Sequence, residues 1–147
     1  MEESVSLRDT ARGIEDFFHI TPKDIRTFSP LTLAYIGDDV YDLVVRTIVV
    51  ENGNAPVNKI DRRCSKIVRA TAQCKSMRAI EPLLTEEEAG VYRRGRNAHS
   101  YTKAKNASVE EYRVATGFEA LLGYLYLTGQ TERMFTLISE GIDALDK

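Results

Sequence analysis

The 147-residue sequence predicts an all-α protein that folds as a single domain over residues 1–147. Apolar residues recur at three- and four-residue spacings through most of the chain, which is the period of a helix with one buried face. No segment shows the sustained alternation of apolar and polar residues that is typical of a half-buried strand. A chain of this length in which 43% of the residues are hydrophobic can bury a core of its own. These observations favour a bundle of helices.

Capping signals divide the chain into its expected helices. Residues 4–19 carry apolar side chains at helical spacing and predict an N-terminal helix. Thr21-Pro22 predicts one more short helical segment, and Ser29-Pro30 predicts the start of a long helix, because a capping side chain followed by proline suits a first turn. Two long helices are expected over 31–50 and 56–84. A further helix is expected to begin after Thr85, and another to begin after Ser108 and end at Gly129. The last expected helix covers 131–145.

Two of these apolar helices carry an acid close to a glycine. Asp38 directly follows Gly37 in the first, and Glu119 lies four residues before Gly123 in the second. Glycine in a helix lets another backbone approach, so the two helices can cross there and bring their carboxylates together. Adjacent carboxylates repel and usually share a proton or a cation. We therefore expect Asp38 and Glu119 to bind a divalent metal ion, unless the acids of the first helix simply lie on a solvated face.

The formal net charge of −2 conceals a basic middle third. Residues 1–58 carry 5 basic and 10 acidic side chains, residues 59–105 carry 12 and 5, and residues 106–147 carry 3 and 7. Such a basic region indicates a surface for a polyanion, unless it pairs with acidic helices of the same fold. A basic stripe on the 56–84 helix and the loop expected over 93–105 suit phosphate and ribose contacts. The candidate RNA-binding residues are Arg62, Arg63, Lys66, Arg93, Arg94, Arg96, Asn97, Lys103 and Lys105.

The cysteines and the N-terminus predict a protein of a reducing cytoplasm. Cys64 and Cys74 lie ten residues apart, with no second pair and no histidine at zinc-finger spacing, so we expect two free thiols. No apolar run is long enough to span a membrane, and the acidic, polar start of the chain is unlike a secretion signal. No membrane partner is expected.

Short motifs in the chain resemble the catalytic domain of the ribonuclease III family. Residues 33–38 (LAYIGD) are similar to the signature helix of that family, and residues 116–123 (TGFEALLG) are similar to its second acidic helix. Residues 93–98 (RRGRNA) resemble in particular the Mini-ribonuclease III subfamily, a short bacterial form without a double-stranded-RNA-binding domain. The resemblance covers roughly residues 30–140, and residues 1–29 are an N-terminal helical extension that matches poorly.

The resemblance implies the helical bundle of a ribonuclease III catalytic domain, a homodimer that cuts both strands of double-stranded RNA. The family's catalytic and metal-binding aspartate falls on Asp38, and the corresponding glutamate falls on Glu119. The implied cofactor is Mg²⁺, for which Mn²⁺ could substitute, and the products carry 5′-phosphates and short 3′ overhangs. For the Mini form, the implied substrate is the precursor of large-subunit (23S) ribosomal RNA, with a ribosomal protein that presents it as a further partner. Apolar side chains that would suit the dimer interface are Tyr124, Leu125 and Tyr126.

The chain departs from larger family members at positions where they carry further acids. Here those positions hold Leu31, Ala34 and Thr116, as suits the acid-poor Mini form, which leaves the number of metal ions open. Asp39 stands where a small residue is usual, and it either adds a ligand or points away. Without a separate binding domain, RNA binding is expected to be weak and to depend strongly on salt.

Two other interpretations are open. A catalytically silent ribonuclease III-like dimer would bind structured RNA in ribosome assembly without cleaving it. A helical adaptor would use its basic middle third to bind an acidic protein. The presence of both Asp38 and Glu119 favours the enzyme, because neither alternative gives a reason to keep buried acids.

Overall fold

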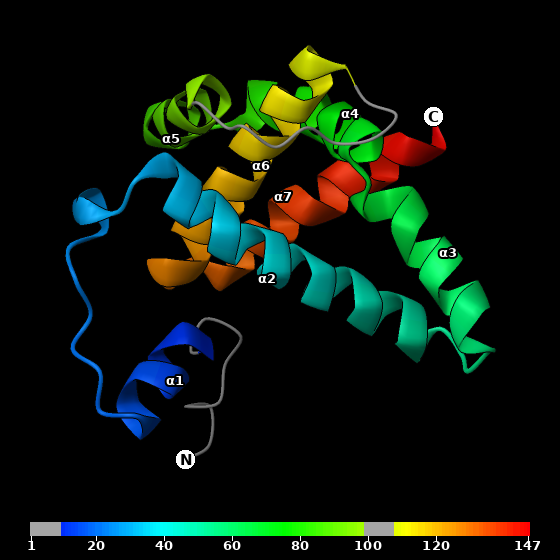
Figure 1. Ribbon diagram of the computed structural model, residues 1–147, viewed down its shortest axis with the longest axis horizontal. Helices are drawn as coiled ribbons and strands as arrows, with labels where there is room; N and C mark the ends of the chain where they lie inside the picture. Colours follow the sequence, from blue (N-terminus) through cyan, green and yellow to red (C-terminus); the bar gives the residue numbers. More distant parts are fainter. Residues whose placement is uncertain (1–9, 99–107) are drawn as a thin grey trace.

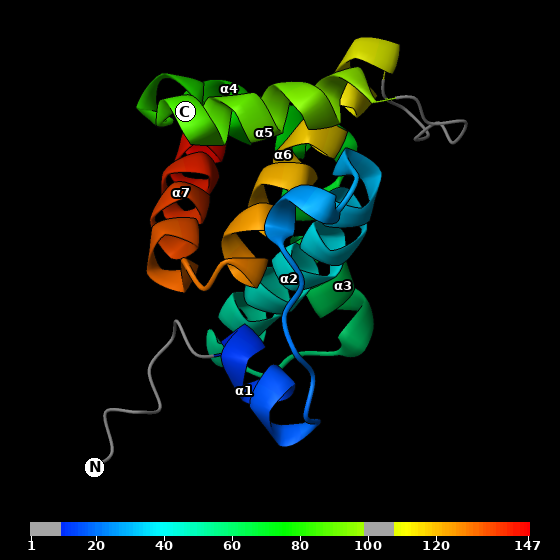
Figure 2. The same ribbon diagram turned by 90° about the vertical axis from the view of Figure 1, so that its left-hand side faces the viewer.

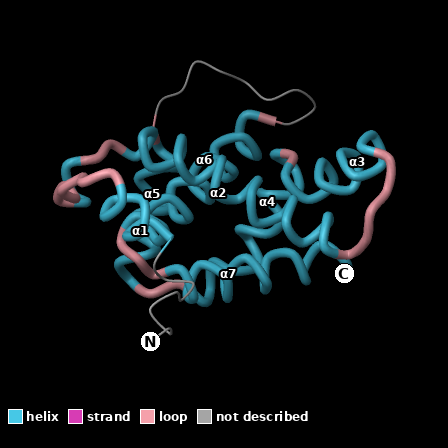
Figure 3. The backbone as a smooth tube through the Cα atoms, turned by 90° about the horizontal axis from the view of Figure 1, so that it is seen from below, coloured by secondary structure: helices cyan, strands magenta, loops and turns pink. Residues whose placement is uncertain are grey.

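The computed structural model describes residues 10–98 and 108–147. Within these ranges the chain forms helices, turns and loops without a strand, which confirms the all-α fold class (Figure 3). The α-helices are α1 (Thr10–Phe17), α2 (Pro30–Glu51), α3 (Val57–Val68), α4 (Ala70–Ile80), α5 (Glu86–Asn97), α6 (Val109–Leu127) and α7 (Thr131–Asp143). The 3-10 turns are η3 (Ile25–Thr27), η4 (Glu81–Leu83) and η5 (Ala144–Asp146).

Helix α6 lies at the centre of the fold. Helices α2, α4, α5 and α7 all pack against it, and α2 crosses it near the middle of the molecule (Figure 1). From Val114 to Leu125 every residue of α6 is buried except Glu119, which is half-buried. A helix that is apolar on all sides is typical of a protein interior. The single acid in this run therefore calls for an explanation other than solubility.

Helices α2 and α6 touch backbone to backbone at two glycines. A Cβ atom on Gly37 would overlap the carbonyl oxygen of Glu119, and a Cβ atom on Gly123 would overlap the carbonyl oxygen of Leu33. Any side chain at either position would push the helices apart. The predicted crossing at these glycines is confirmed.

Three predicted helix starts are confirmed by their caps. The Ser29 side chain accepts a hydrogen bond from the backbone N–H three residues on and is followed by proline at the start of α2. Thr85 with Glu88 forms a capping box at α5, and Ser108 with Glu111 forms another at α6. In each box the two side chains satisfy backbone N–H groups that have no partner within the helix.

The single helix expected over residues 56–84 is wrong, because the chain turns between α3 and α4. Arg69 lies at the break with an extended backbone (φ −65°, ψ 156°). Helix α3 packs on α2, whereas α4 turns to pack on α6 and α7, and most of its side chains are buried. No glycine or proline marks this break, so tertiary packing overrides the local helical preference of the segment.

The N-terminal elements are shorter than predicted. Helix α1 occupies only part of the 4–19 segment, of which residues 4–9 lie outside the described part of the chain. The helical segment expected after Thr21 begins later, at Asp24, whose carboxylate accepts a hydrogen bond of 2.9 Å from the N–H two residues on.

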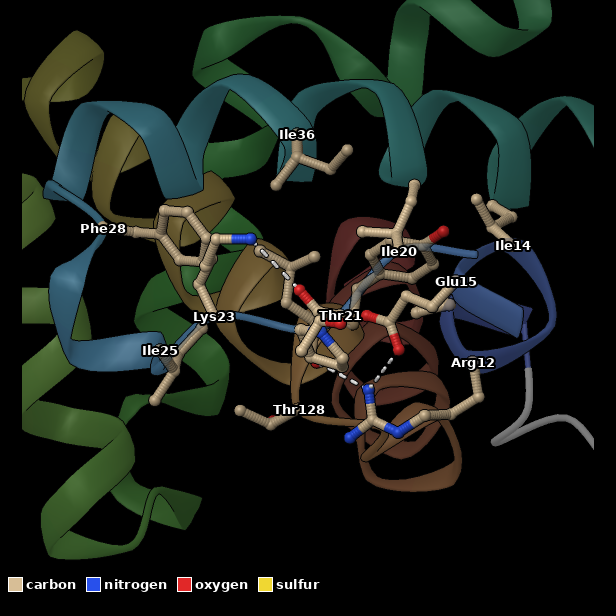
Figure 4. Close-up of a pocket in the computed structure, with 14 residues that line it drawn as sticks. Arg12, Ile14, Glu15, Ile20, Thr21, Lys23, Ile25, Phe28, Ile36 and Thr128 are labelled. Carbon is tan, nitrogen blue, oxygen red and sulfur yellow. Dashed lines mark hydrogen bonds and ion pairs between the residues drawn. The ribbon is translucent and has the colours of Figure 1, made fainter. Parts of the chain in front are cut away.

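Helix α1 lies at the edge of the bundle, as Figures 1 and 2 both show. Its Arg12 guanidinium donates to Glu15 at 3.2 Å and to the carbonyl oxygen of Leu127, at the end of α6, at 3.3 Å. Between α1, α6 and Ile36 of α2 lies a hollow of about 500 Å³ (Figure 4). Neither acid of the α2–α6 crossing lines it.

Two further expectations concern membranes and thiols. Among the residues that the structure describes, none of the helices combines the length and the apolar character needed to cross a membrane. Cys64 and Cys74 are both buried and free, as predicted, so no disulfide joins them.

Candidate active site

The crossing of α2 and α6 brings Asp38 and Glu119 together. Asp38 directly follows the close contact at Gly37, and Glu119 supplies the backbone oxygen of that contact. Their carboxyl groups lie within hydrogen-bonding reach of each other. Asp38 is exposed and Glu119 is half-buried, so the pair is open to solvent on one side. A large substrate can reach such a site without entering a cavity.

The surroundings of Glu119 disfavour its negative charge. Burial, followed by the charge of Asp38 and a hydrogen bond with it, raises the pKa of Glu119 to about 8. Asp42, one turn after Asp38, contributes in the same direction. The pKa of Asp42 is itself raised, first by burial and then by Asp38, while Arg46 opposes the shift. Three carboxylates therefore repel one another here, and a cation would relieve that repulsion.

A buried amide on α4 contacts the acid pair. The Nε2 atom of Gln73 lies 3.2 Å from Oε2 of Glu119 and 2.8 Å from the carbonyl oxygen of Val68. Gln73 is 3% exposed. Gln73 is not among the site residues predicted from the sequence, although a glutamine on the apolar side of a helix was a usable signal.

Three of the other positions singled out by the resemblance, Leu31, Ala34 and Thr116, carry no carboxylate. Thr116 is buried, and its hydroxyl donates a 3.0 Å bond to the carbonyl oxygen of Tyr112 in its own helix. Ala34 is buried, and Leu31 and Asp39 are exposed. In residues 10–98 and 108–147 no group of three or more His, Cys, Asp or Glu side chains is arranged to hold a metal ion.

The donor chemistry at the crossing nevertheless fits Mg²⁺. This ion keeps several of its waters and is typically bound through one or two carboxylates plus a substrate phosphate. Asp38 and Glu119 supply two adjacent carboxylates at an accessible surface, with no Lys or Arg contributing to the shifted pKa of Glu119. The pair therefore suits an external cation.

Of the candidate RNA-binding residues, those on α3 are exposed: Arg62, Arg63 and Lys66. On α5, Arg93, Arg94 and Asn97 are exposed, and the half-buried Arg96 lies over the ring of Tyr92 at 5.7 Å. Lys103 and Lys105 lie outside the described residues. In Figure 1 the helices that carry these residues, α3 and α5, lie at opposite ends of the molecule, on either side of the α2–α6 crossing.

The loop expected from residue 93 onward is partly wrong, because α5 continues to Asn97. Gly95 is a helical residue at the contact with α6. A Cβ atom there would lie 2.7 Å from the Cβ of Ala120 and 3.0 Å from the Cα of Gly117. Helix packing, and not loop flexibility, explains this glycine.

Two of the three residues proposed for a dimer interface do not suit that role. Leu125 is fully buried and Tyr124 is 7% exposed, both within the core of one chain. Tyr126 is half-buried against the same core. The expectation is wrong for Tyr124 and Leu125, because their side chains face the other helices of the same fold, and it stays a prediction for Tyr126.

A family model described as the ribonuclease III domain matches residues 31–130, more than half of the chain. The chain belongs to the ribonuclease III family. Mini-ribonuclease 3 of Thermoanaerobacter sp. (strain X514) is 45% identical over 128 residues, which cover 87% of this chain and 90% of the relative. Mini-ribonuclease 3 of Clostridium tetani is 47% identical over 115 residues, which cover 78% and 76%. These relatives confirm the resemblance to Mini-ribonuclease III and identify the chain as an endoribonuclease of this family.

A solved structure agrees with this assignment. A crystal structure of a protein from Fusobacterium nucleatum matches with a TM-score of 0.74 at 30% identity, and the match covers 80% of this chain and 95% of the other. The family match begins at residue 31, two residues after Ser29, the N-cap of α2. Helix α1 therefore lies outside the part of the chain that the family model describes.

Proposed function

We propose that this ribonuclease III family member is a Mg²⁺-dependent endoribonuclease that cleaves double-stranded RNA at the Asp38–Glu119 pair. The observation that carries the proposal is the backbone contact of α2 and α6, which places these two carboxyl groups together at an accessible surface. Repulsion between them is reduced when a cation binds. No three metal-ligating side chains of the described residues are arranged to hold an ion together, which suits an ion that keeps most of its waters.

In this proposal the chain's own residues hold and orient the reacting groups. Asp38 and Glu119 would hold the cofactor beside the scissile phosphate, and the same two residues would hold Mn²⁺. When bound, Mg²⁺ supplies positive charge that stabilises the departing oxygen and lowers the pKa of a water. The exposed position of Asp38 lets the RNA backbone approach from solvent. The products would carry 5′-phosphates, as the family resemblance implies.

Basic side chains on both sides of the pair would bind the RNA backbone. The exposed arginines and lysine of α3 and the arginines at the end of α5 suit phosphate contacts, which do not depend on base sequence. Binding should weaken steeply as salt increases, because each neutralised phosphate releases counterions. An affinity that stays constant between about 50 and 200 mM salt would contradict this assignment.

From the Mini-ribonuclease III resemblance we further propose a homodimer that matures the precursor of large-subunit (23S) ribosomal RNA in the cytoplasm. Two active centres would then cut the two strands of one duplex. Exposed apolar side chains on α2 leave a surface for a second copy, among them Tyr35 at 77% and Leu43 at 65% exposure. A ribosomal protein that presents the substrate would be an additional partner.

The test is cleavage of an end-labelled RNA duplex with Mg²⁺ and with EDTA, with single-stranded RNA and duplex DNA as controls. We expect cleavage of the RNA duplex only, and only with Mg²⁺. The variants Asp38→Asn and Glu119→Gln should each lose at least about 100-fold in rate, the scale of removing one electrostatic group from an active site. Binding without cleavage in the wild-type protein would instead favour the catalytically silent RNA-binding module.

A further inference from the structure

Gln73 is the buried polar side chain of α4 that reaches the acid pair. It is 3% exposed, and its neighbours on the buried side of α4 include Cys74, Met77 and Ile80. Its Nε2 atom lies 3.2 Å from Oε2 of Glu119. The residue is remote from Glu119 in sequence and lies on a different helix, so the fold itself brings its amide to the site.

The second hydrogen bond of this amide decides which way round it lies. Nε2 of Gln73 is 2.8 Å from the carbonyl oxygen of Val68, which can only accept. If the amide were turned over, its oxygen would face this carbonyl oxygen and a carboxylate oxygen together, and neither contact could form. The two protons on Nε2 therefore point to Val68 and to Glu119.

The remaining atom of the amide has no partner among the described residues. Oε1 of Gln73 is buried without a hydrogen bond. An unsatisfied buried acceptor destabilises a fold relative to an apolar side chain of similar shape. The unsatisfied Oε1 offsets part of what the bond to Val68 contributes, and the second N–H group of the amide is directed at Glu119.

We propose that Gln73 is a positioning residue that holds the Glu119 carboxylate in the orientation needed to bind the divalent cation. This inference rests on the proposed metal-dependent function. The N–H group of Gln73 fixes Oε2, and fixing one carboxylate oxygen sets the direction in which the other points. Outer groups that hydrogen-bond to a ligand in this way typically change metal affinity by about 10- to 100-fold when they are removed.

A purely structural role for Gln73 is the competing explanation. Its bond to Val68 satisfies a carbonyl at the end of α3, and the turn between α3 and α4 follows directly. If that bond were the whole role, removal of the amide would alter the stability of the fold but not its affinity for a metal ion. Metal affinity and stability therefore need to be measured separately.

The experiment compares Gln73→Met with the wild-type protein. Mn²⁺ binding is followed by electron paramagnetic resonance without RNA, and thermal unfolding is followed by circular dichroism in EDTA. We expect the dissociation constant for Mn²⁺ to rise about tenfold and the melting temperature to fall, because the bond to the Val68 carbonyl is also lost. Cleavage should recover when Mg²⁺ is raised, since only the affinity for the ion is changed.

Ser76→Ala is the matched control. Ser76 is a fully buried residue of the same helix, and its hydroxyl donates a 2.8 Å bond to the carbonyl oxygen of Gly141, away from the acid pair. Its loss should lower the melting temperature and leave Mn²⁺ affinity unchanged. A control that weakened Mn²⁺ binding as much as Gln73→Met would overturn the proposal, because any damage to α4 would then suffice.

The outcomes separate this inference from the proposed function. Wild-type binding that Glu119→Gln abolishes and Gln73→Met leaves unchanged would overturn only the role of Gln73. Wild-type protein that binds no Mn²⁺ and cleaves no RNA would overturn the proposed function itself. If Gln73→Met does not fold, Gln73→Leu is measured in its place, and failure of both to fold would show that the amide serves the fold and would also overturn the proposal.

Discussion

Glu88 and Glu119 are two glutamates set among apolar helices, and their surroundings shift their pKa values in opposite directions. Glu88 has a side chain that is 5% exposed and accepts two hydrogen bonds of 2.9 Å from Arg133 on α7. It also accepts a 2.9 Å bond from the backbone N–H of Thr85. These hydrogen bonds, with that to Arg133 the strongest, lower the pKa of Glu88. The fold itself supplies the cation that this acid needs.

Glu119 has no such partner. Its closest charged neighbour is another carboxylate, Asp38, and burial together with that charge raises its pKa to about 8. The one hydrogen-bond donor that reaches it from the described part of the chain is the neutral amide of Gln73. A partly buried acid whose pKa is strongly raised by its surroundings is a marker of a functional site. Glu88 thus ties α5 to α7 through Arg133, whereas the surroundings of Glu119 fit the cation binding that we propose.

The largest effect should follow from Gly37→Ala. The new methyl group would overlap the carbonyl oxygen of Glu119, so α2 and α6 must separate. We expect the free energy of unfolding to fall by at least about 3 kcal/mol, the upper range for overpacking, and RNA cleavage to be lost. Urea titration and the duplex cleavage assay measure the two effects.

Gly13→Ala is the control for that substitution. Gly13 lies in α1, and a Cβ atom there would meet no atom within 4 Å. This change should cost no stability, because alanine is the better helix former. If Gly37→Ala were as well tolerated, the acid pair would not depend on the close contact of the two helices.

The sequence was most informative at the α2–α6 crossing. Two glycines and two acids in otherwise apolar helices predicted both the crossing and the pairing of Asp38 with Glu119, because packing leaves few other uses for such residues in a buried segment. Capping residues placed the starts of α2, α5 and α6 for a similar reason, since their side chains act on their own backbone. These features depend on local chemistry that a sequence displays directly.

Features that depend on distant contacts were not predictable in the same way. The break at Arg69 has no glycine or proline, and it exists because α4 packs on α6 and α7. Gln73 lies on α4, after this break, and reaches Glu119 because α4 packs on α6. Leu125 was expected at an interface because the residues around it are apolar, yet its side chain is fully buried within the fold. Only the tertiary arrangement distinguishes a core residue from a surface one in such a helix.

A smaller effect, of opposite sign at the two sites, is expected from removing each charge in turn. Glu88→Gln should lower the free energy of unfolding by about 2 kcal/mol, less than for a fully buried ion pair, because the Arg133 side chain is 34% exposed. Glu119→Gln, measured in EDTA, should leave stability unchanged or raise it, because it removes repulsion from Asp38. Chemical denaturation of both variants measures these differences.

RNA cleavage by the same two variants completes this comparison. Glu88→Gln should retain cleavage at a temperature where it is folded, whereas Glu119→Gln should not cleave. Loss of stability in Glu119→Gln equal to that in Glu88→Gln would mean that both acids serve the fold. Glu119 could then no longer be distinguished from Glu88, whose charge is neutralised by Arg133, as an acid that needs a cation from solution.

The smallest expected effect is a pH dependence specific to Glu88. Its pKa in the folded protein is lowered from the usual value of 4.5, mainly by Arg133. The stability that it contributes is therefore fully present above about pH 4.5, and it is lost as the pH falls through the lower folded-state pKa. The difference in free energy of unfolding between wild type and Glu88→Gln should be constant from pH 7 to about pH 5 and should shrink at lower pH. A difference that grew on acidification would mean that Glu88 is protonated more easily in the folded state, which its bonds to Arg133 oppose.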